Sequence, residues 1–204
     1  MTQSEPTVFV VDDDSAVLNG LRLLIKSVGM NVETYLSAQE FLDSYDPAKP
    51  GCLVLDIRMP TMSGLELQEM LQKKKMGIPV IIVTGYGDVP VAVQAMKNGA
   101  VDFIEKPFSD QVLLDRIQNS IAEDIQARQK EAERKELEAR LVLLTPRERQ
   151  VMELVTAGKL NKVIASELGL SQKTVEFHRN HIMEKMKVDS VAELVRLVTI
   201  VSRG

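Results

Sequence analysis

The sequence predicts an α/β domain followed by a long helical linker and an all-α domain. In the first part, short apolar runs alternate with stretches of helical periodicity, a pattern typical of a doubly wound parallel sheet. In the last part, apolar residues recur only at helical spacing. We therefore expect an α/β domain over residues 1–124, a linker over residues 125–141 and a helical domain over residues 142–204.

Five strands and five helices alternate in the first domain. Runs rich in β-branched and other apolar residues predict strands at residues 7–11, 31–35, 52–56, 78–85 and 102–106. Apolar residues spaced three or four apart predict helices at residues 16–29, 37–45, 63–74, 89–99 and 109–125. The central strands are apolar throughout, which indicates a five-stranded parallel sheet covered by helices on both faces. In such a sheet, functional side chains gather beyond the carboxyl ends of the strands.

The linker is predicted to be helical. Residues 120–144 contain no proline or glycine and carry many charges of both signs, so we expect the helix of residues 109–125 to continue through them. Three leucines have the spacing of a coiled-coil seam: Leu137, Leu141 and Leu144. Arg128 and Lys135 would interrupt the heptads, which favours a solvated helical linker over a stable coiled coil.

The last 60 residues predict four helices, at residues 145–158, 161–169, 171–186 and 190–201. Two of these helices open on a capping-box pattern: Thr145 with Glu148, and Ser190 with Glu193. Gly169 ends the second helix, and Ser171 begins the third after a tight turn. Two short helices joined in this way form a helix-turn-helix.

Charge is distributed unevenly along the chain. Residues 1–125 carry a net charge of −8, residues 126–141 of +1 and residues 142–204 of +3. An acidic half joined to a basic half favours different partners, and nucleic acid suits the basic half. The single cysteine, Cys52, lies inside an apolar run and is interpreted as a small core residue. With no signal-peptide pattern and no apolar stretch long enough to span a bilayer, we expect a cytoplasmic protein with no membrane partner.

Acidic residues follow two predicted strands. Residues 12–14 are three aspartates at the end of the first strand, and Asp56 ends the third. These strands are neighbours in a doubly wound sheet, so the carboxylates are expected to converge on one crevice with Thr84 and Lys106 from the fourth and fifth strands. Like charges that close raise a pKa or recruit a cation, and Mg²⁺ accepts one or two carboxylates together with water and phosphate oxygens. This set suits an aspartyl-phosphate site.

Four segments of this domain match a known family: VVDDD, LVLDIRMPTMSG, IIVTGYGD and AMKNGAVDFIEKPF. They resemble the receiver domains of two-component response regulators, which have a CheY-like or flavodoxin-like fold. The resemblance implies that Asp56 accepts a phosphoryl group from a histidine kinase, with Mg²⁺ as cofactor. It also implies the supporting residues: Asp13, Asp56, the backbone carbonyl of Arg58 and, through water, Asp12 for Mg²⁺; Lys106 and Thr84 for the phosphoryl oxygens; and Phe103 as a switch residue that turns inward.

Several details of the resemblance carry further expectations. The Lys106–Pro107 peptide bond would be cis, which aims the ammonium into the crevice. Many receivers have tyrosine where this chain has Phe103, so this switch would act by packing alone. Asp14 has no role by resemblance and is interpreted as a solvated cap of the first helix. Phosphohydrolases also use a nucleophilic aspartate with Mg²⁺, but they need a second aspartate two residues later, where this chain has Arg58.

The last domain resembles a second family. The segments LTPRERQV and NKVIASELGLSQKTVEFHRNHIMEKM are similar to the LuxR-type DNA-binding domain, and with the receiver they identify a FixJ-like member of the NarL/FixJ class of response regulators. The resemblance places DNA binding on the helix-turn-helix from Asn161 to Asn180. Base edges would be met by Glu176, Phe177 and Asn180, and phosphates by Lys173, Thr174, His178, Arg179 and Lys185.

Two features of this helix allow more than one interpretation. His178 and His181 are three positions apart, but zinc needs more ligands, so a DNA-facing or packing role is favoured. Glu176 can accept from cytosine N4, or it can pair with Lys173 or Arg179 on its own helix.

The combined resemblance implies a phosphorylation-activated transcription regulator and not an enzyme, apart from self-catalysed phosphoryl transfer to Asp56 and hydrolysis from it. The implied partners are a cognate sensor histidine kinase, promoter DNA, a second copy of the chain on phosphorylation, and RNA polymerase. The rival functions are DNA binding independent of phosphorylation, which a missing acceptor or lysine would favour, and RNA binding, which the helix-turn-helix argues against.

Overall fold

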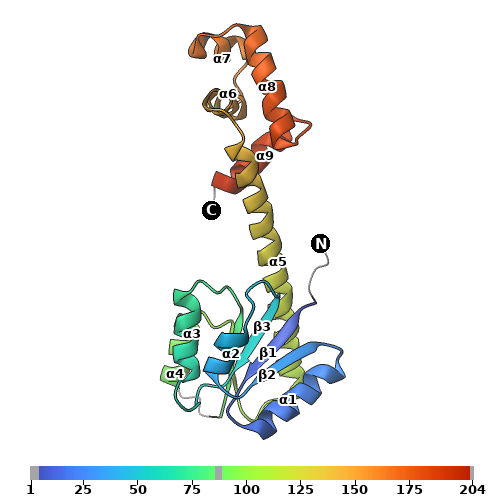
Figure 1. The fold of residues 1–204 in the computed structure, drawn as a ribbon, viewed down its shortest axis with the longest axis vertical. Coiled ribbons are helices and arrows are strands. Elements are labelled where there is room, and N and C mark those ends of the chain that lie inside the picture. The colour runs from blue at the N-terminus through green and yellow to red at the C-terminus, as the bar shows by residue number, and fades with distance from the viewer. Residues whose placement is uncertain (1–4, 86–88, 203–204) are drawn as a thin grey trace. The chain divides into compact units, whose positions relative to one another are not determined.

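In the computed structural model, which describes residues 5–85 and 89–202, the chain divides into two units, residues 1–128 and 129–204 (Figure 1). The described residues form five strands and nine helices. Residues 86–88, which belong to the IIVTGYGD segment, lie outside the described residues. The expected class, an α/β domain with a helical continuation and a helix-turn-helix domain, is confirmed.

The first unit is built on a parallel sheet. Its strands are β1 (Thr7–Val11), β2 (Asn31–Tyr35), β3 (Gly51–Leu55), β4 (Val80–Thr84) and β5 (Asp102–Glu105). They lie in the order β2-β1-β3-β4-β5, and every neighbouring pair is parallel. In this doubly wound order, strands are added on one side of β1 and then on the other, so the strand order reverses between β1 and β3.

The register of the sheet brings the strand ends together. Val11 pairs with Leu55, so the residues that follow them, Asp12 and Asp56, emerge side by side at one edge. Thr84 pairs with Glu105 at the end of the next two strands. Because all these ends are carboxyl ends of parallel strands, one edge collects the polar residues that the sequence placed there.

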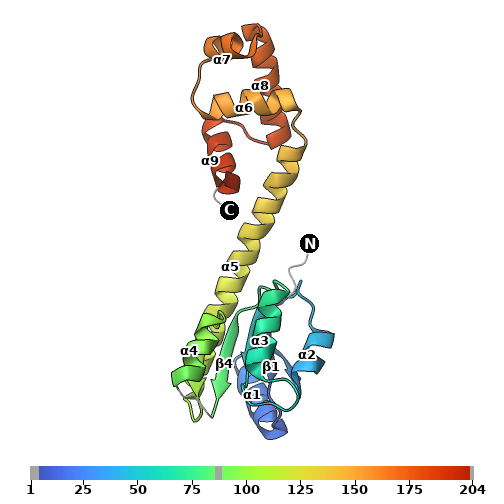
Figure 2. The same ribbon diagram turned by 90° about the vertical axis from the view of Figure 1, so that its left-hand side faces the viewer.

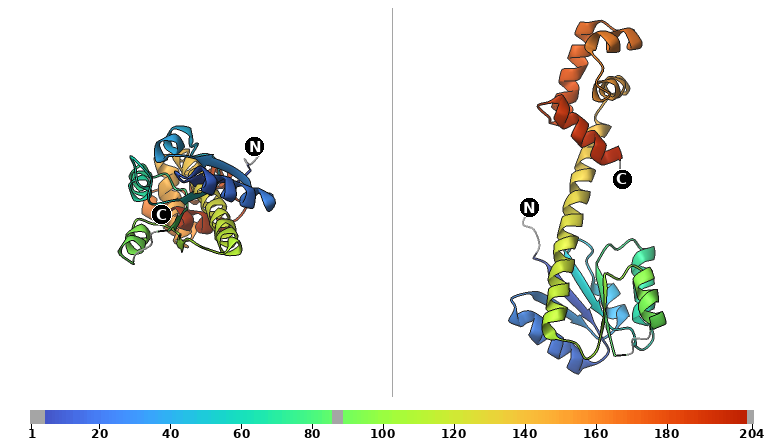
Figure 3. Two further views of the ribbon diagram at one scale, coloured as in Figure 1. Left: turned by 90° about the horizontal axis from the view of Figure 1, so that it is seen from below. Right: turned by 180° about the vertical axis from the view of Figure 1, so that it is seen from behind.

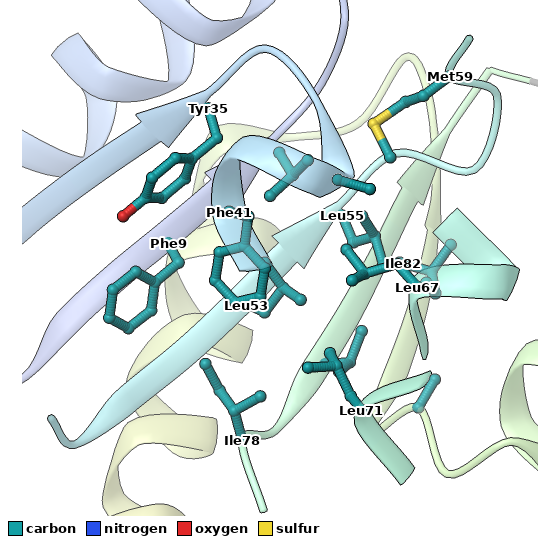
Figure 4. Close-up of a cluster of buried hydrophobic side chains, with 14 of the residues drawn as sticks. Phe9, Tyr35, Phe41, Leu53, Leu55, Met59, Leu67, Leu71, Ile78 and Ile82 are labelled. Atoms are coloured by element: carbon teal, nitrogen blue, oxygen red, sulfur yellow. The ribbon is translucent and has the colours of Figure 1, made fainter. Parts of the chain in front are cut away.

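Helices cover both faces of the sheet (Figure 3). These helices are α1 (Ser15–Ser27), α2 (Ala38–Ser44), α3 (Gly64–Lys73), α4 (Val89–Lys97) and α5 (Asp110–Val142). Side chains of α1 and α5 pack in one core cluster with alternate residues of the strands, and side chains of α2, α3 and α4 pack in the other. Figure 4 shows the second cluster, in which Phe41 of α2 packs edge-on against Phe9 of β1 with ring centroids 5.9 Å apart. Cys52 is buried in the first cluster, as expected of a core residue.

The linker region is helical, but it is not solvated throughout. Helix α5 runs without interruption from Asp110 to Val142, which confirms the expected long helix. Leu137 and Leu144 are buried, and Leu144 and Leu141 belong to the core of the second unit. The leucines with seam spacing therefore face their own domain, because the second unit needs apolar residues from the end of α5 to close its core.

The second unit adds four helices, α6 (Pro146–Thr156), α7 (Asn161–Leu168), α8 (Gln172–Met186) and α9 (Val191–Ser202), shown in Figure 2. Its core contains Val151, Ile164, Val175 and Ile182, one or more from each of α6, α7 and α8. Gly169 ends α7 with φ 66°, a left-handed conformation that glycine adopts without strain. The turn before α8 is therefore short, and α7 and α8 form the expected helix-turn-helix.

The two predicted capping boxes have different outcomes. At the start of α6, Thr145 and Glu148 each accept from the other's backbone N–H, so the box is complete. Before α9, Ser190 accepts from the N–H of Glu193, but the Glu193 carboxylate accepts from Asp189 instead of Ser190. The second box is therefore only half correct, because the side chain reaches one residue further back.

Candidate functional site

Asp12 and Asp56 lie together at the carboxyl edge of the sheet. The Asp56 N–H donates to the carbonyl of Val11 at 2.9 Å, which carries the ladder between β1 and β3 one residue past the strands. Asp12 is 4% exposed and Asp56 is 8% exposed. Two carboxylates that close and that buried are costly unless a cation or hydrogen-bond donors reach them.

The cation is the ammonium of Lys106. Its Nζ lies 2.8 Å from Asp12 Oδ2 and 3.1 Å from Asp56 Oδ1, so it bridges the two carboxylates. The Lys106 N–H donates to the Thr84 carbonyl at 2.9 Å, which fixes the backbone of Lys106 beside β4. The Lys106–Pro107 peptide bond is cis, as expected.

The carboxylates also receive backbone donors. The N–H of Arg58 donates to Asp56 Oδ2 at 2.6 Å, and the N–H of Asp14 donates to Asp12 Oδ1 at 2.9 Å. Asp14 caps α1 by accepting from Ala16, which confirms its expected role. These contacts fix both carboxylates from the loops that follow β1 and β3.

The two members of the ion pair respond differently to burial. Burial raises the pKa of the Asp56 carboxyl, and the hydrogen bond and charge of Lys106 only partly oppose it. Burial alone would lower the pKa of the Lys106 ammonium, but its hydrogen bonds to Asp12 and Asp56 outweigh burial and raise this pKa. Lys106 therefore keeps its proton, while Asp56 carries its negative charge at a cost. Such a carboxylate is stabilised by a further cation.

Gly64 is a residue of this site that the sequence analysis missed. A Cβ on Gly64 would lie 2.1 Å from the backbone oxygen of Asp56, so no larger residue fits without moving the loop. The Gly64 N–H donates to the carbonyl of Ile57 at 2.9 Å. Gly64 thus holds the start of α3 against the backbone of Asp56. The signal was the glycine in the matched segment LVLDIRMPTMSG, which the residue-by-residue reasoning did not use.

The remaining receiver residues lie around this edge. Thr84 is fully buried at the end of β4. Phe103 on β5 is half-buried and packs against the core cluster of α2, α3 and α4. Asp13 is exposed beside Asp12. The structure thus brings Asp12, Asp56 and Lys106 into contact and places the others on adjoining elements.

The carboxylates fit a magnesium ion. Mg²⁺ binds oxygen, usually through one or two carboxylates, and keeps several waters. Asp12 and Asp56 supply two such oxygens at one edge, where Lys106 already supplies positive charge. In the part of the chain that the structure describes, no group of three or more His, Cys, Asp or Glu side chains is arranged to hold a metal. A magnesium ion at this edge would therefore be held by aspartate oxygens, completed by backbone oxygen and water.

A second candidate surface lies on α8. The exposed residues near its start include Lys173, Glu176, Phe177 and Asn180, and Phe177 is 57% exposed although it is aromatic. The opposite face of α8 is buried in the core of the second unit. The exposed face thus combines a cation, an amide, an acid and an apolar ring, which are groups able to meet phosphates and base edges.

Two cations of α8 have partners inside the unit. Lys185 Nζ lies 2.7 Å from Glu148 Oε2, and Glu148 is only 3% exposed. Arg179 Nη1 donates to Asn161 Oδ1 at 2.8 Å, which ties α8 to the start of α7. Both residues were expected at phosphates, and each contact competes with that role. The pairing of Glu148 and Lys185 was not predicted, because in the sequence Glu148 fits a capping box and shows no sign of a second partner.

Glu176 and the two histidines of α8 have different surroundings. Within the described residues Glu176 forms no salt bridge, so pairing with Lys173 or Arg179 is not what the structure shows. The ring of His181 packs against Phe177 with centroids 4.1 Å apart. The ring of His178 lies edge-on to the Phe177 ring, with centroids 6.0 Å apart.

Two family models match the chain. Residues 8–118 match the response regulator receiver domain, and residues 142–198 match the LuxR family of bacterial regulatory proteins. The first match lies within the first unit and the second within the second unit. Among the described residues, no helix is both long enough and apolar enough to cross a membrane.

Relatives match along nearly the whole chain. The transcriptional regulatory protein FixJ of Bradyrhizobium diazoefficiens is 45% identical over 190 residues, 93% of this chain and 93% of FixJ. The response regulator protein TmoT of Ectopseudomonas mendocina is 44% identical over 197 residues, 97% of this chain and 90% of TmoT. Among solved structures, the response regulator StyR has a TM-score of 0.89 at 48% identity and covers 96% of this chain and 99% of its own. Full-length FixJ from B. japonicum has a TM-score of 0.60 at 42% identity, with 98% and 99% covered.

Proposed function

The chain belongs to the response regulators that join a receiver domain to a LuxR-type DNA-binding domain, and we propose that Asp56 is its phosphoryl acceptor and α8 its DNA-reading helix. The protein is a phosphorylation-dependent transcriptional regulator and not an enzyme that turns over a separate substrate. The observation that carries the proposal is the bridge of Lys106 between two buried carboxylates at the carboxyl edge of the sheet.

Asp56 is the proposed nucleophile. Its Oδ2 accepts from the N–H of Arg58 and its Oδ1 from Lys106, and burial raises its pKa, so the carboxylate is more basic than usual and a better nucleophile toward phosphorus. An Asp56 oxygen attacks the phosphorus of a phosphorylated histidine on the partner kinase or of a small acyl phosphate. The bond from phosphorus to the donor breaks, its electron pair leaves with the donor, and an aspartyl phosphate forms.

The surrounding residues have distinct roles in this step. Lys106, released from Asp56, pairs with a phosphoryl oxygen, and Thr84 supplies a hydroxyl from the end of β4. Receiver domains generally bind Mg²⁺ at the phosphorylation site, and here it would be held by Asp13, Asp56 and the backbone carbonyl of Arg58, with Asp12 acting through water. When bound, the ion neutralises charge on the phosphoryl group. The same residues support hydrolysis of the aspartyl phosphate by water, so both reactions at Asp56 are self-catalysed.

Phosphorylation is proposed to favour a homodimer through the receiver. Movement of Thr84 toward the phosphoryl group would free space for Phe103, which has no hydroxyl and acts by packing. Exposed apolar side chains lie on and next to α4, β5 and α5: Val89, Val93, Met96, Val101 and Val112. Apolar side chains in this number favour a protein partner, and a second copy brings two DNA-binding units to a two-fold site.

DNA binding is proposed for the helix-turn-helix from Asn161 to Asn180. Asn180 is exposed on α8, and an amide pairs with adenine N6 and N7 in bidentate fashion. Lys173, Thr174, His178 and Arg179 lie on the same helix at positions suited to phosphates, and Glu176 and Phe177 to base edges. Lys185 contributes there only if it leaves Glu148. The partners are then a cognate sensor histidine kinase, promoter DNA and RNA polymerase, all in the cytoplasm.

The acceptor is tested by labelling with acetyl phosphate and Mg²⁺. Wild type should gain one phosphoryl group by intact mass, and Asp56→Asn should gain none because the amide is not a nucleophile. Asp14→Asn is the matched control, since Asp14 is exposed at the same edge and only caps α1. Labelling of Asp56→Asn equal to wild type would refute the assignment. The labelled chain should be a dimer by light scattering at about 50 μM, a concentration suited to transient interfaces.

The reading role of α8 is tested by Asn180→Ala. Loss of a bidentate pair costs roughly 1–3 kcal/mol of discrimination against the wrong base. Asn180→Ala should therefore lose preference for the duplex that the phosphorylated wild type selects from a random pool, while its salt dependence stays unchanged. A wild-type ratio of specific to non-specific affinity in this variant would show that Asn180 does not read a base.

A further inference from the structure

The last turns of the linker helix α5 are built into the second unit. Leu137 is 5% exposed and Leu144 is 4% exposed, and Leu141 packs against the core cluster of that unit. Positions spaced three or four apart share one face of a helix. Arg140 lies on this face between the leucines, so its side chain is directed to the same core and not to solvent alone.

Arg140 makes two charge-assisted contacts there. Its Nη1 donates to the backbone carbonyl of Met186 at 2.9 Å, and its Nη2 donates to Glu136 at 2.7 Å. The side chain is 21% exposed, and among the described residues its Nε is buried with no hydrogen-bond partner. The guanidinium is therefore largely taken out of water and directed at one carbonyl of α8.

That carbonyl belongs to the last residue of α8. The last four carbonyls of a helix have no partner inside it. At the end of α8, Lys187 adopts a left-handed conformation with φ 54°, and the N–H groups of Lys187 and Val188 turn back to Glu184 and Met183. Neither of these N–H groups donates to the Met186 carbonyl, which accepts from Arg140. The positive charge of Arg140 also stabilises the negative end of the helix dipole. Arg140 is thus a C-cap that one helix supplies to another.

The other anchors of α8 lie elsewhere along the helix. Arg179 bonds to Asn161 at the start of α7, and Lys185 pairs with Glu148 of α6. Only the bond from Arg140 joins α8 to α5 among the hydrogen bonds of the described residues. The end of α8 is therefore held by the helix that continues from the receiver unit.

We propose that Arg140 is a positioning residue for DNA reading, which fixes the C-terminal end of α8 to the end of α5 within the second unit. This inference rests on the proposed role of α8 as the reading helix. The linker then has a part in sequence recognition beyond joining two domains.

Two other roles for Arg140 make different predictions. A direct contact with a DNA phosphate would lower the slope of affinity against salt by about 1 when Arg140 is removed. A purely structural role would lower the stability of the second unit without changing the ratio of specific to non-specific affinity. A positioning role changes that ratio and leaves the salt slope unchanged.

The test uses three variants of the full chain and the duplex that the phosphorylated wild type selects from a random pool. Arg140→Met keeps the apolar stem but loses the donors. Arg134→Gln is the matched control, because Arg134 lies on the same helix and, within the described residues, its hydrogen bonds go to Glu131 and Glu138 of α5. Arg140→Lys keeps the charge without the two-point geometry. Affinity for selected and scrambled duplexes is measured at several salt concentrations, and amide exchange is followed at residues 186–188.

Arg140→Met should lose about tenfold in the ratio of selected to scrambled affinity, about 1.4 kcal/mol. Its salt slope should not change, and amides 186–188 should exchange faster. Arg134→Gln should match the wild type in affinity ratio, salt slope and amide exchange. The proposal is overturned if Arg140→Met has the same ratio of selected to scrambled affinity as Arg134→Gln, or if its slope of affinity against salt falls by about 1. If Arg140→Met does not fold, Arg140→Lys decides: a lowered ratio of selected to scrambled affinity supports the proposal, and a ratio equal to that of Arg134→Gln overturns it. If the wild type selects no duplex, the proposed function fails, while amide exchange still tests Arg140.

Discussion

Each unit of this protein buries a carboxylate against a lysine, and the two pairs differ in what burial does to the acid. In the receiver, Lys106 is shared between Asp12 and Asp56, and the pKa of Asp56 is raised because burial outweighs its donors. In the DNA-binding unit, burial opposes the charge of Glu148, but Lys185 and the capping bonds from Thr145 outweigh it and lower the pKa. The donors around Asp56 do not offset the cost of burying its charge, whereas those around Glu148 do.

The difference separates the carboxylate that we propose as phosphoryl acceptor from a structural one. Two acids share one cation at the sheet edge, so Lys106 alone does not neutralise both Asp12 and Asp56. Glu148 has one lysine and the donors of its own capping box, so it holds α6 to α8 and has no further chemistry to do. Burial alone does not distinguish these two acids. They differ in whether the hydrogen bonds and charges around the carboxylate offset the cost of burying it.

The largest expected effect is from Lys185→Met. The change leaves Glu148 buried without its cation, and removal of one partner of a buried pair is strongly destabilising. Because Lys185 is partly exposed, we expect the second unit to lose about 2 kcal/mol of unfolding free energy. Urea unfolding monitored by amide exchange in α6 and α8 measures it.

Lys173→Met is the matched control for this change. Lys173 is exposed on the same helix, and substitutions at such positions usually change stability by no more than about 0.5 kcal/mol. Equal stability of the two variants would mean that Glu148 is satisfied by its capping bonds alone, and the contrast between the two acids would disappear.

The position of Asp56 at the sheet edge was predictable from the sequence, whereas the pairing of Glu148 with Lys185 was not. Asp56 and Thr84 were found because parallel strands place their carboxyl ends at one edge, and the strand ends are visible in the apolar runs. Glu148 and Lys185 are 37 positions apart on separate helices, and a helix surface carries many charges of either sign. Which of them meet depends on how helices pack, and local pattern does not encode that.

The packing of the linker leucines could not be predicted for the same reason. Leu137, Leu141 and Leu144 have a spacing that fits a coiled-coil seam and a domain core equally well, because both need apolar residues three or four apart. Only the packed second unit shows that Leu144 is buried in its core and that Leu141 packs against that core. Gly64 was similarly hidden, because its need for a small side chain comes from the backbone of Asp56 eight positions earlier.

A smaller effect of opposite sign is expected from Asp56→Asn. In the folded receiver the pKa of Asp56 is raised, so the charged carboxylate makes the folded state less stable above the ordinary value of 3.8. Removing the charge should stabilise the first unit by about 1 kcal/mol at neutral pH without Mg²⁺. Thermal unfolding of both proteins at several pH values measures the difference.

The pH dependence of the two acids should run in opposite directions. The contribution of Asp56 is favourable below 3.8 and is lost as pH rises through its raised pKa, so the advantage of Asp56→Asn should shrink as pH falls. The contribution of Glu148 is favourable above its ordinary value of 4.5 and is lost as pH falls through its lowered pKa. If Glu148→Gln and Asp56→Asn change stability with the same sign at pH 7, the two acids are not different in kind.

The smallest expected effect separates the two lysines of α8 by their dependence on salt. Lys173 is exposed and free to meet a phosphate, whereas the ammonium of Lys185 is held by Glu148. Loss of one phosphate contact reduces the slope of affinity against salt by about 1. Lys173→Ala should show this reduction with unchanged stability, and Lys185→Met should keep the wild-type slope despite its lower stability. Titration of both variants against one duplex at several salt concentrations decides. An equal reduction in the two would mean that Lys185 leaves Glu148 when DNA binds, which would make the structural acid a participant in DNA binding.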